Sequence, residues 1–192
     1  MLTLKENKRS DPPLFEFYTG LRCGTPEAMG VTEALALAMR LFPGTKEGAD
    51  YTLTISHNRR VQVNAWRNRT LAPEGAIMLR APLATRAGNR PQDMWVWPGL
   101  QLMGAGGKCL KGLFITVTSV SAETVELSNG LTLTHDAAVR CLRLTHALCY
   151  AAVQGLTLPG RVRLETSGPH FTLKHLYVGS SRATAASLLE VV

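Results

Sequence analysis

Two apolar stretches, each followed by small polar residues, constrain the fold of this chain most strongly. In the first, 144–158 (LTHALCYAAVQGLTL), a strand or short helix over 147–153 ends at Gln154-Gly155, and a second strand starts over 156–158. At Gly155 the backbone can turn sharply or approach a ligand closely. In the second, 175–184 (HLYVGSSRAT), the pattern predicts a strand followed by Arg182. Open α/β sheets bind ligands where the carboxyl ends of their strands meet, so we expect the two segments to lie side by side at one sheet edge.

These segments carry the residues of two known sequence motifs. The pattern Q-G-x-T is formed by Gln154, Gly155 and Thr157, and the pattern Y-V-x-x-S-R-A is formed by Tyr177, Val178, Ser181, Arg182 and Ala183. Both resemble the last two motifs of superfamily-one DNA helicases of the RecD/Pif type, T-x-H-K-S-Q-G-x-T and Y-V-A-x-S-R-A. The resemblance covers the last part of the chain directly and, more loosely, the chain from Tyr51 onward.

The resemblance implies an α/β fold, a RecA-like domain with a mostly parallel sheet and an inserted small β-barrel. It implies three ranges: an N-terminal lead and connecting helix (1–50), the RecA-like helicase C-terminal domain (51–94 and 137–192) and the barrel (95–136). The residues agree with this division. A helix is predicted over 26–41, a strand over 51–56, and short strands with an Asn129-Gly130 hairpin signal inside the barrel range. Strands are also predicted at 161–165 and 190–192, and a helix over 182–189.

A basic helix after the 51–56 strand is the candidate nucleic-acid interface. Ser56-His57-Asn58 can cap this helix, and the Val63-Asn64 pair stands where the helicases carry I-N or L-N. The residues predicted to contact nucleic acid are His57, Asn58, Arg59, Arg60, Asn64 and Thr157. The alternative for the arginines is a solvated helix face; this alternative is as good for Arg59 and Arg60 and better for Arg67 and Arg69.

The catalytic prediction depends on the resemblance. Arg182 matches the arginine finger of the family, a cation that reaches the γ-phosphate across a domain cleft. Gln154, Gly155 and Ser181 would then lie near the nucleotide. An ordinary salt bridge or helix cap is the alternative for Arg182, and a tight turn is the alternative for Gln154-Gly155.

The residues that bind ATP in a helicase are not found in this sequence. The segment 104–108 (GAGGK) has the wrong spacing for a phosphate loop, is followed by Cys109 in place of Ser or Thr, and is interpreted as a hairpin turn. An acidic run for Mg²⁺ and metal-ligand spacing among the histidines are also lacking. We therefore expect ATP and Mg²⁺ to bind only together with an ATP-binding N-terminal helicase domain, supplied in cis or in trans, and no cofactor or metal to bind the isolated chain.

Composition sets the outer limits on function. The chain has 192 residues, 45% of them hydrophobic, and a net charge of +7 that favours polyanionic partners. It has neither an apolar run of about eighteen residues nor an apolar N-terminal signal, so no membrane is predicted as a partner. Its four cysteines form no C-x-x-C pair. This favours an intracellular, reducing compartment, cytoplasm or nucleus.

Two hypotheses from different classes follow. The first is the C-terminal motor domain of an ATP-dependent DNA helicase, which contacts single-stranded DNA and contributes Arg182. The second is a stand-alone, non-catalytic module that binds nucleic acid or protein and derives from a helicase. The family's T-x-H-K-S is replaced here by 149–153 (CYAAV), which indicates either a divergent viral or mobile-element branch or a decayed motor. An unrelated small α/β enzyme is the third alternative.

Overall fold

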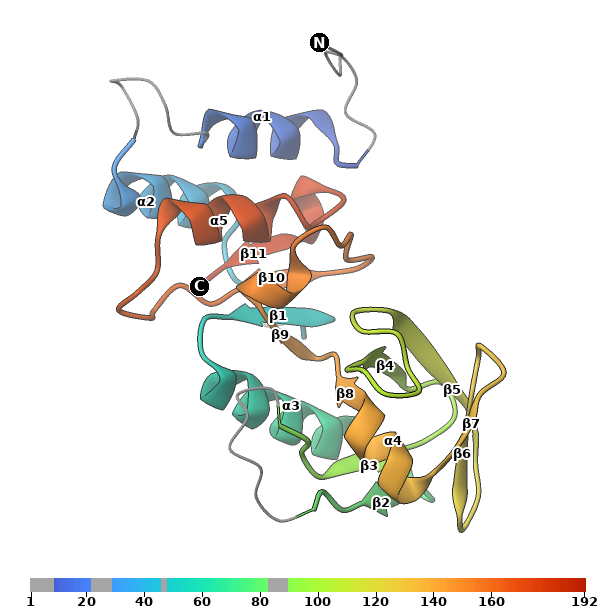
Figure 1. Cartoon of the computed structure of the whole chain (residues 1–192). Coiled ribbons are helices and arrows are strands. Elements are labelled where there is room, and N and C mark those ends of the chain that lie inside the picture. The colour runs from blue at the N-terminus through green and yellow to red at the C-terminus, as the bar shows by residue number, and fades with distance from the viewer. Residues whose placement is uncertain (1–8, 22–28, 46–47, 83–89) are drawn as a thin grey trace. The chain divides into compact units, whose positions relative to one another are not determined.

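The computed structural model describes residues 9–21, 29–45, 48–82 and 90–192 (Figure 1). Its contacts divide the chain into two compact units. Unit 1 consists of Met1–Ser56 and Leu148–Val192, and unit 2 consists of His57–Ala147. These boundaries differ from the predicted ranges. The basic helix and residues 137–147, which were predicted to belong to the RecA-like domain, belong to unit 2 together with residues 95–136 of the predicted barrel. The predicted division into a RecA-like domain and a barrel stays a prediction.

Unit 1 contains a four-stranded sheet in the order β11-β10-β1-β9. The strands are β1 (Tyr51–Thr54), β9 (Ala147–Cys149, the last two residues in this unit), β10 (Val162–Leu164) and β11 (Leu189–Val191). β10 is parallel to both β1 and β11, which confirms a mainly parallel arrangement. All four residues of β1 are buried, as is typical of a strand covered on both faces.

The described residues of unit 1 form three α-helices: α1 (Pro12–Gly20), α2 (Val31–Leu41) and α5 (Leu173–Ser180). α2 contacts β11 and α5 contacts β10, whereas α1 packs on α5. In Figure 1 they lie on the same side of the strands. α1 begins at Pro12 because Asp11 caps it, accepting a hydrogen bond from the amide of Leu14 at 3.2 Å. The same carboxylate accepts a hydrogen bond from the amide of Ala186, so it also holds the short 3₁₀ helix η2 (Ala186–Leu188). The first residues of the predicted 26–41 helix lie outside the described part.

Some predicted elements around the C-terminal motifs were wrong. Residues 175–178 belong to helix α5, not to a strand, because Thr172 and His175 form a capping box that starts a helix. Residues 156–158 form no strand, and the predicted 182–189 helix contains only η2. The stretch 147–153 combines both alternatives, since β9 is followed by a 3₁₀ helix, η1 (Tyr150–Val153).

Unit 2 is built on a five-stranded antiparallel sheet in the order β7-β6-β5-β4-β8. Its strands are β4 (Gln101–Gly104), β5 (Phe114–Val120), β6 (Thr124–Leu127), β7 (Thr132–Thr134) and β8 (Leu142–Leu144). A second ribbon pairs β2 (Ile77–Leu79) with β3 (Met94–Val96). The β6–β7 hairpin turns at Asn129-Gly130 with Gly130 at φ 82°, as the sequence predicts. The sheet is curled, and its closure into a barrel stays a prediction.

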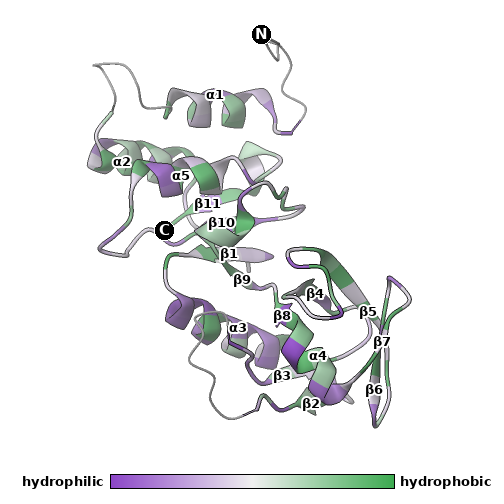
Figure 2. Cartoon of the chain, in the orientation of Figure 1, coloured by the Kyte–Doolittle hydropathy of each residue, from purple (hydrophilic) through white to green (hydrophobic). Residues whose placement is uncertain are grey.

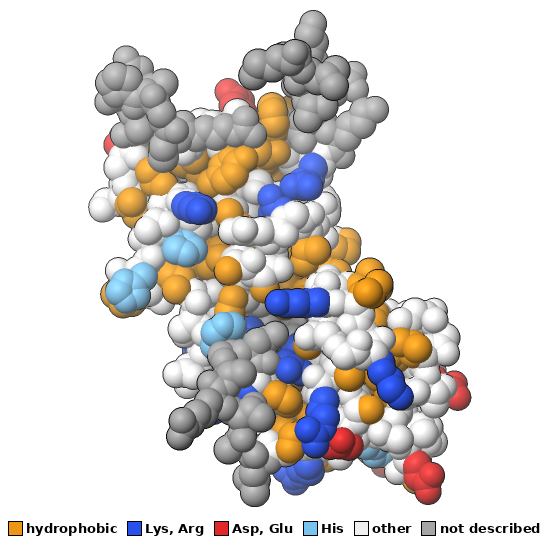
Figure 3. Space-filling model, in the orientation of Figure 1, with side chains coloured by type: hydrophobic (Ala, Val, Ile, Leu, Met, Phe, Trp, Pro, Cys, Tyr) orange, Lys and Arg blue, Asp and Glu red, His pale blue; other side chains and the backbone are white. Residues whose placement is uncertain are grey.

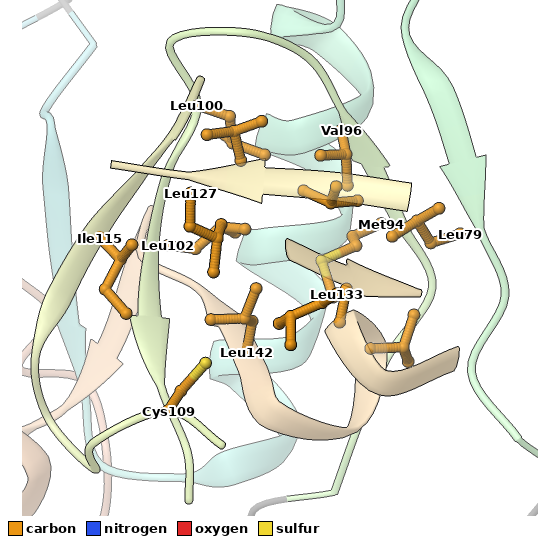
Figure 4. Close-up of a cluster of buried hydrophobic side chains, with 14 of the residues drawn as sticks. Leu79, Met94, Val96, Leu100, Leu102, Cys109, Ile115, Leu127, Leu133 and Leu142 are labelled. Carbon is orange, nitrogen blue, oxygen red and sulfur yellow. The ribbon is translucent and has the colours of Figure 1, made fainter. Parts of the chain in front are cut away.

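The core of unit 2 is an apolar cluster enclosed by these strands and by α4 (His135–Cys141) (Figure 4). Alternate residues of the strands point into it, which is the pattern of a half-buried antiparallel sheet. Its labelled members are Leu79, Met94, Val96, Leu100, Leu102, Cys109, Ile115, Leu127, Leu133 and Leu142.

Helix α3 (His57–Leu71) packs on unit 2 through polar side chains, and Figure 2 shows it coloured largely as hydrophilic. Its buried residues are Arg60, Asn64 and Asn68. The Asn64 amide donates to the carbonyl oxygen of Ala147 at 3.0 Å and accepts from the Ala147 amide at 2.7 Å. Asn68 makes the same pair of bonds to Trp95, at 2.9 and 2.7 Å. Each asparagine therefore satisfies both backbone groups of one strand residue.

We expect Asn64→Ala to lower the free energy of unfolding by about 2 kcal/mol, because it leaves two buried backbone groups of Ala147 unpaired. Urea unfolding followed by circular dichroism measures this loss. Gln62→Ala is the matched control, since Gln62 is exposed on the same helix. Equal unfolding midpoints for the two variants would contradict the role given to the Asn64 amide.

Candidate functional site

The Gln154-Gly155 turn follows η1 in unit 1. Both residues are exposed, and so is Thr157. Gly155 has φ 84°, a left-handed conformation that a side chain disfavours, and the amide of Leu156 closes the turn on the carbonyl oxygen of Val153 at 3.1 Å. The sharp turn expected at this glycine is confirmed, and its approach to a ligand stays a prediction.

Arg182 lies directly against this turn. Its guanidinium donates to the carbonyl oxygen of Leu156 at 2.9 Å and to that of Val153 at 3.4 Å. It also donates to the carbonyl oxygen of Val178 at 3.1 Å and to the Ser181 hydroxyl at 2.8 Å. The two motif segments are therefore in contact, joined by one guanidinium that bonds to both.

The way in which they meet differs from the expected one. Arg182 follows the end of α5 rather than a strand, and its side chain is directed into the turn. The residue is only 7% exposed. Burial, and to a smaller extent the charge of Arg9, lowers the pKa of this guanidinium. In this arrangement Arg182 holds the Gln154-Gly155 turn against the end of α5, and its role as an arginine finger stays a prediction.

Ser181 and Gly179 fix the position of Arg182. Ser181 is 3% exposed, and its hydroxyl donates to the carbonyl oxygen of Val178 while accepting from Arg182. A Cβ on Gly179 would lie 2.7 Å from Leu164 and 2.8 Å from the ring of Tyr150, so only glycine lets α5 approach β10 and η1 so closely. Gly179 was not identified from the sequence, although a glycine inside an apolar stretch is a signal of close packing.

The predicted nucleic-acid residues other than Thr157 lie in unit 2. His57, Asn58 and Arg59 are exposed at the start of α3, where a phosphate contact is sterically open. Arg60 is 4% exposed and Asn64 is fully buried. The structure gives Asn64 a positioning role toward Ala147, and its predicted contact with nucleic acid gains no support from this burial.

Among the described residues there is no group of three or more His, Cys, Asp or Glu that could hold a metal ion. Gly104 is the last residue of β4, and residues 105–108 lie in the β4–β5 connection, with Gly106 at φ 119° and Gly107 at φ 67°. β4 and β5 pair antiparallel, which confirms a hairpin turn. Arg182 is turned inward. That ATP and Mg²⁺ bind only together with an ATP-binding N-terminal domain stays a prediction. Within the same residues, no helix is both long and apolar enough to cross a membrane.

No protein-family model matches the chain, and no curated protein matches its sequence. Solved structures of Pif1 helicases do match its fold. The Pif1 helicase from Candida albicans aligns over 100% of this chain at 19% identity, with a TM-score of 0.67. Bacteroides Pif1 bound to ssDNA aligns over 95% at 17% identity and a TM-score of 0.59. Bacteroides Pif1 in complex with ADP-AlF3 and ssDNA aligns over 99% at 18% identity and a TM-score of 0.59.

At these identities the likeness shows a shared fold. The chain covers 56%, 49% and 51% of the three helicase chains, so it spans about half the length of the structures that it matches. The resemblance to RecD/Pif-type helicases is therefore confirmed at the level of the fold.

Proposed function

We propose that this chain is the C-terminal motor half of an ATP-dependent DNA helicase. It contacts single-stranded DNA and works with an ATP-binding half, in cis or in trans. The observation that carries the proposal is the contact between Arg182 and the Gln154-Gly155 turn, in a chain that has the fold of about half a Pif1 helicase. Both motifs of the family resemblance thus meet at one place in the fold.

The chain's own contribution to the motor follows from the bonds of Arg182. For the guanidinium to reach a γ-phosphate, it must leave the carbonyl oxygens of Val153 and Leu156. Its departure removes the bonds that hold the Gln154-Gly155 turn to the end of α5. Engagement of Arg182 with a nucleotide on the other half would therefore release this turn, which couples the nucleotide state to the exposed residues around it.

The proposed function is tested by pairing the full chain with an ATP-binding helicase half, supplied in cis or in trans. We expect no ATP hydrolysis by the chain alone and hydrolysis stimulated by single-stranded DNA in the pair, measured by phosphate release. The ATP-binding half alone is the control. If the two halves together hydrolyse ATP no faster than this control, with or without DNA, the proposal that this chain is a motor half is refuted.

The inward direction of Arg182 favours the second candidate, a stand-alone module without catalysis. In that protein Arg182 stabilises the turn permanently and never meets a nucleotide. Salt-dependent binding of single-stranded DNA, together with no ATPase in any pairing, is the result expected for it.

A further inference from the structure

Helix α3 carries an exposed tryptophan between arginines. Residues separated by three, four or seven positions share one face of a helix. The exposed residues with this spacing, here called the Trp66 face, are Arg59, Gln62, Trp66 and Arg69. Trp66 is 66% exposed, which is a large apolar surface left in water for a side chain of this type.

This face points outward because the opposite face is fixed by hydrogen bonds. Asn64 and Asn68 are buried and pair with the backbone of Ala147 and Trp95. With 3.6 residues per turn, Trp66 lies about 160° around the helix from each of the two asparagines. The direction of the indole therefore follows from the bonds that attach the helix to unit 2.

The distribution of side chains on α3 is the reverse of that of an ordinary packing helix, which buries its apolar residues and exposes its amides. Here the asparagines are inside and the tryptophan is outside. An exposed indole contributes little to the stability of unit 2. A single exposed apolar side chain is ordinary on a protein surface, so what distinguishes Trp66 is the arginine on each side of it along this face.

The charge of the helix identifies the chemistry of a partner for this face. α3 contains no Asp or Glu, and the Trp66 face has Arg59 about 10 Å away along the axis on one side and Arg69 about 4.5 Å away on the other. Figure 3 shows several Lys and Arg side chains on the viewed face of unit 2, with one acidic side chain among them and others at the right-hand edge. A flat aromatic surface between cations fits a strand whose bases stack and whose phosphates pair with guanidinium groups.

We propose that the Trp66 face binds single-stranded nucleic acid, with a base stacked on the Trp66 indole and the flanking phosphates on Arg59 and Arg69. A duplex presents no free base face inside its stack, so it engages only the arginines. That the partner is a single-stranded nucleic acid rests on the proposed function. It adds Trp66 and Arg69 as residues that contact this partner.

The test uses the full chain and a short fluorescein-labelled oligothymidylate, with Kd measured by fluorescence anisotropy. We expect Trp66→Ala to raise Kd about tenfold and Trp66→Phe to restore most of the binding, because a phenyl ring also stacks. Arg69→Gln lowers the slope of log Kd against log salt by about 1. Leu71→Ala is the matched control, since Leu71 is exposed on α3 but lies about 140° around the helix from Trp66.

The outcomes separate this inference from the proposed function. If the wild type binds the oligonucleotide and Trp66→Ala binds it equally well, the Trp66 face is refuted and the proposed function is untouched. An equal loss in Leu71→Ala also refutes it, because the effect then belongs to the whole helix. If the wild type binds no oligonucleotide at all, or binds only an acidic peptide, both proposals fall. If a duplex is bound as tightly as the single strand, the proposed stacking of a base on Trp66 is refuted.

Discussion

Glu190→Ala is expected to destabilise unit 1 by about 3 kcal/mol, because it removes the partner of two arginines at a site from which water is largely excluded. Glu190 lies on β11 and is 2% exposed. Its carboxylate accepts from Arg163, the residue opposite it on β10, at 2.8 Å, and from Thr45. Arg161 approaches it at 3.4 Å. The arginine side chains are about a quarter exposed, which places the expected loss at the lower end for such pairs.

The same carboxylate makes the stability of unit 1 depend on pH. Burial raises the pKa of Glu190, but hydrogen bonds from Thr45 and Arg163 and the charge of Arg163 outweigh it, so that the pKa lies below its ordinary value of 4.5. The ionised form therefore stabilises the folded state. This contribution is fully present above pH 4.5 and is lost as the pH falls through the lowered pKa.

Chemical denaturation of the wild type, Glu190→Ala and Glu190→Gln at neutral and acidic pH measures both effects. Glu190→Gln keeps the shape and the hydrogen-bond acceptor, so it should cost less than Glu190→Ala and should show a smaller loss of stability in acid. Asp136→Asn is the matched control, because the Asp136–Arg140 ion pair is exposed. A wild type and a Glu190→Gln variant with the same acid dependence would contradict the role of this carboxylate.

The sequence predicted the strands better than it predicted how the C-terminal motifs are held. β1 and the β6–β7 hairpin follow from local signals, alternating β-formers and an Asn-Gly turn. The segment 175–178 has the composition of a strand, but the capping box formed by Thr172 and His175 makes it a helix. The capping box therefore decided the conformation of this segment, although its composition favours a strand. The prediction that the two motif segments follow the ends of neighbouring strands was wrong.

The candidate site was predicted in part, because its residues lie in motifs, but the motifs do not specify which backbone groups these residues bind. Arg182 and Gly155 were identified from sequence, and their segments are in contact. The direction of the Arg182 side chain depends on carbonyl oxygens of η1 and α5, which no residue pattern encodes. The same holds for Asn64, whose Ala147 partner is 83 positions away in the chain.

Arg182→Ala is expected to lower the DNA-stimulated ATPase of the chain, paired with its ATP-binding half, by about 10³-fold, while the Kd for single-stranded DNA changes by less than about twofold. An arginine that stabilises the developing charge on the γ-phosphate contributes an effect of this size, whereas a residue that only stabilises a turn does not. Steady-state phosphate release measures the rate, and fluorescence anisotropy measures the affinity.

Because Arg182 also holds the Gln154-Gly155 turn, the loss must be separated from local unfolding. Unfolding midpoints of both proteins, determined under the assay conditions, show whether the variant is folded while it is inactive. Added guanidinium ions, well below denaturing concentrations, can occupy the vacated site and should return part of the activity if the missing group is the cation itself. Arg182→Lys supplies a charge with a different shape, and it should remain slow because a single ammonium cannot replace the planar fork of donors. Turnover within about twofold of the wild type in a folded Arg182→Ala protein would mean that the guanidinium serves only the turn, which is the arrangement expected of the non-catalytic module.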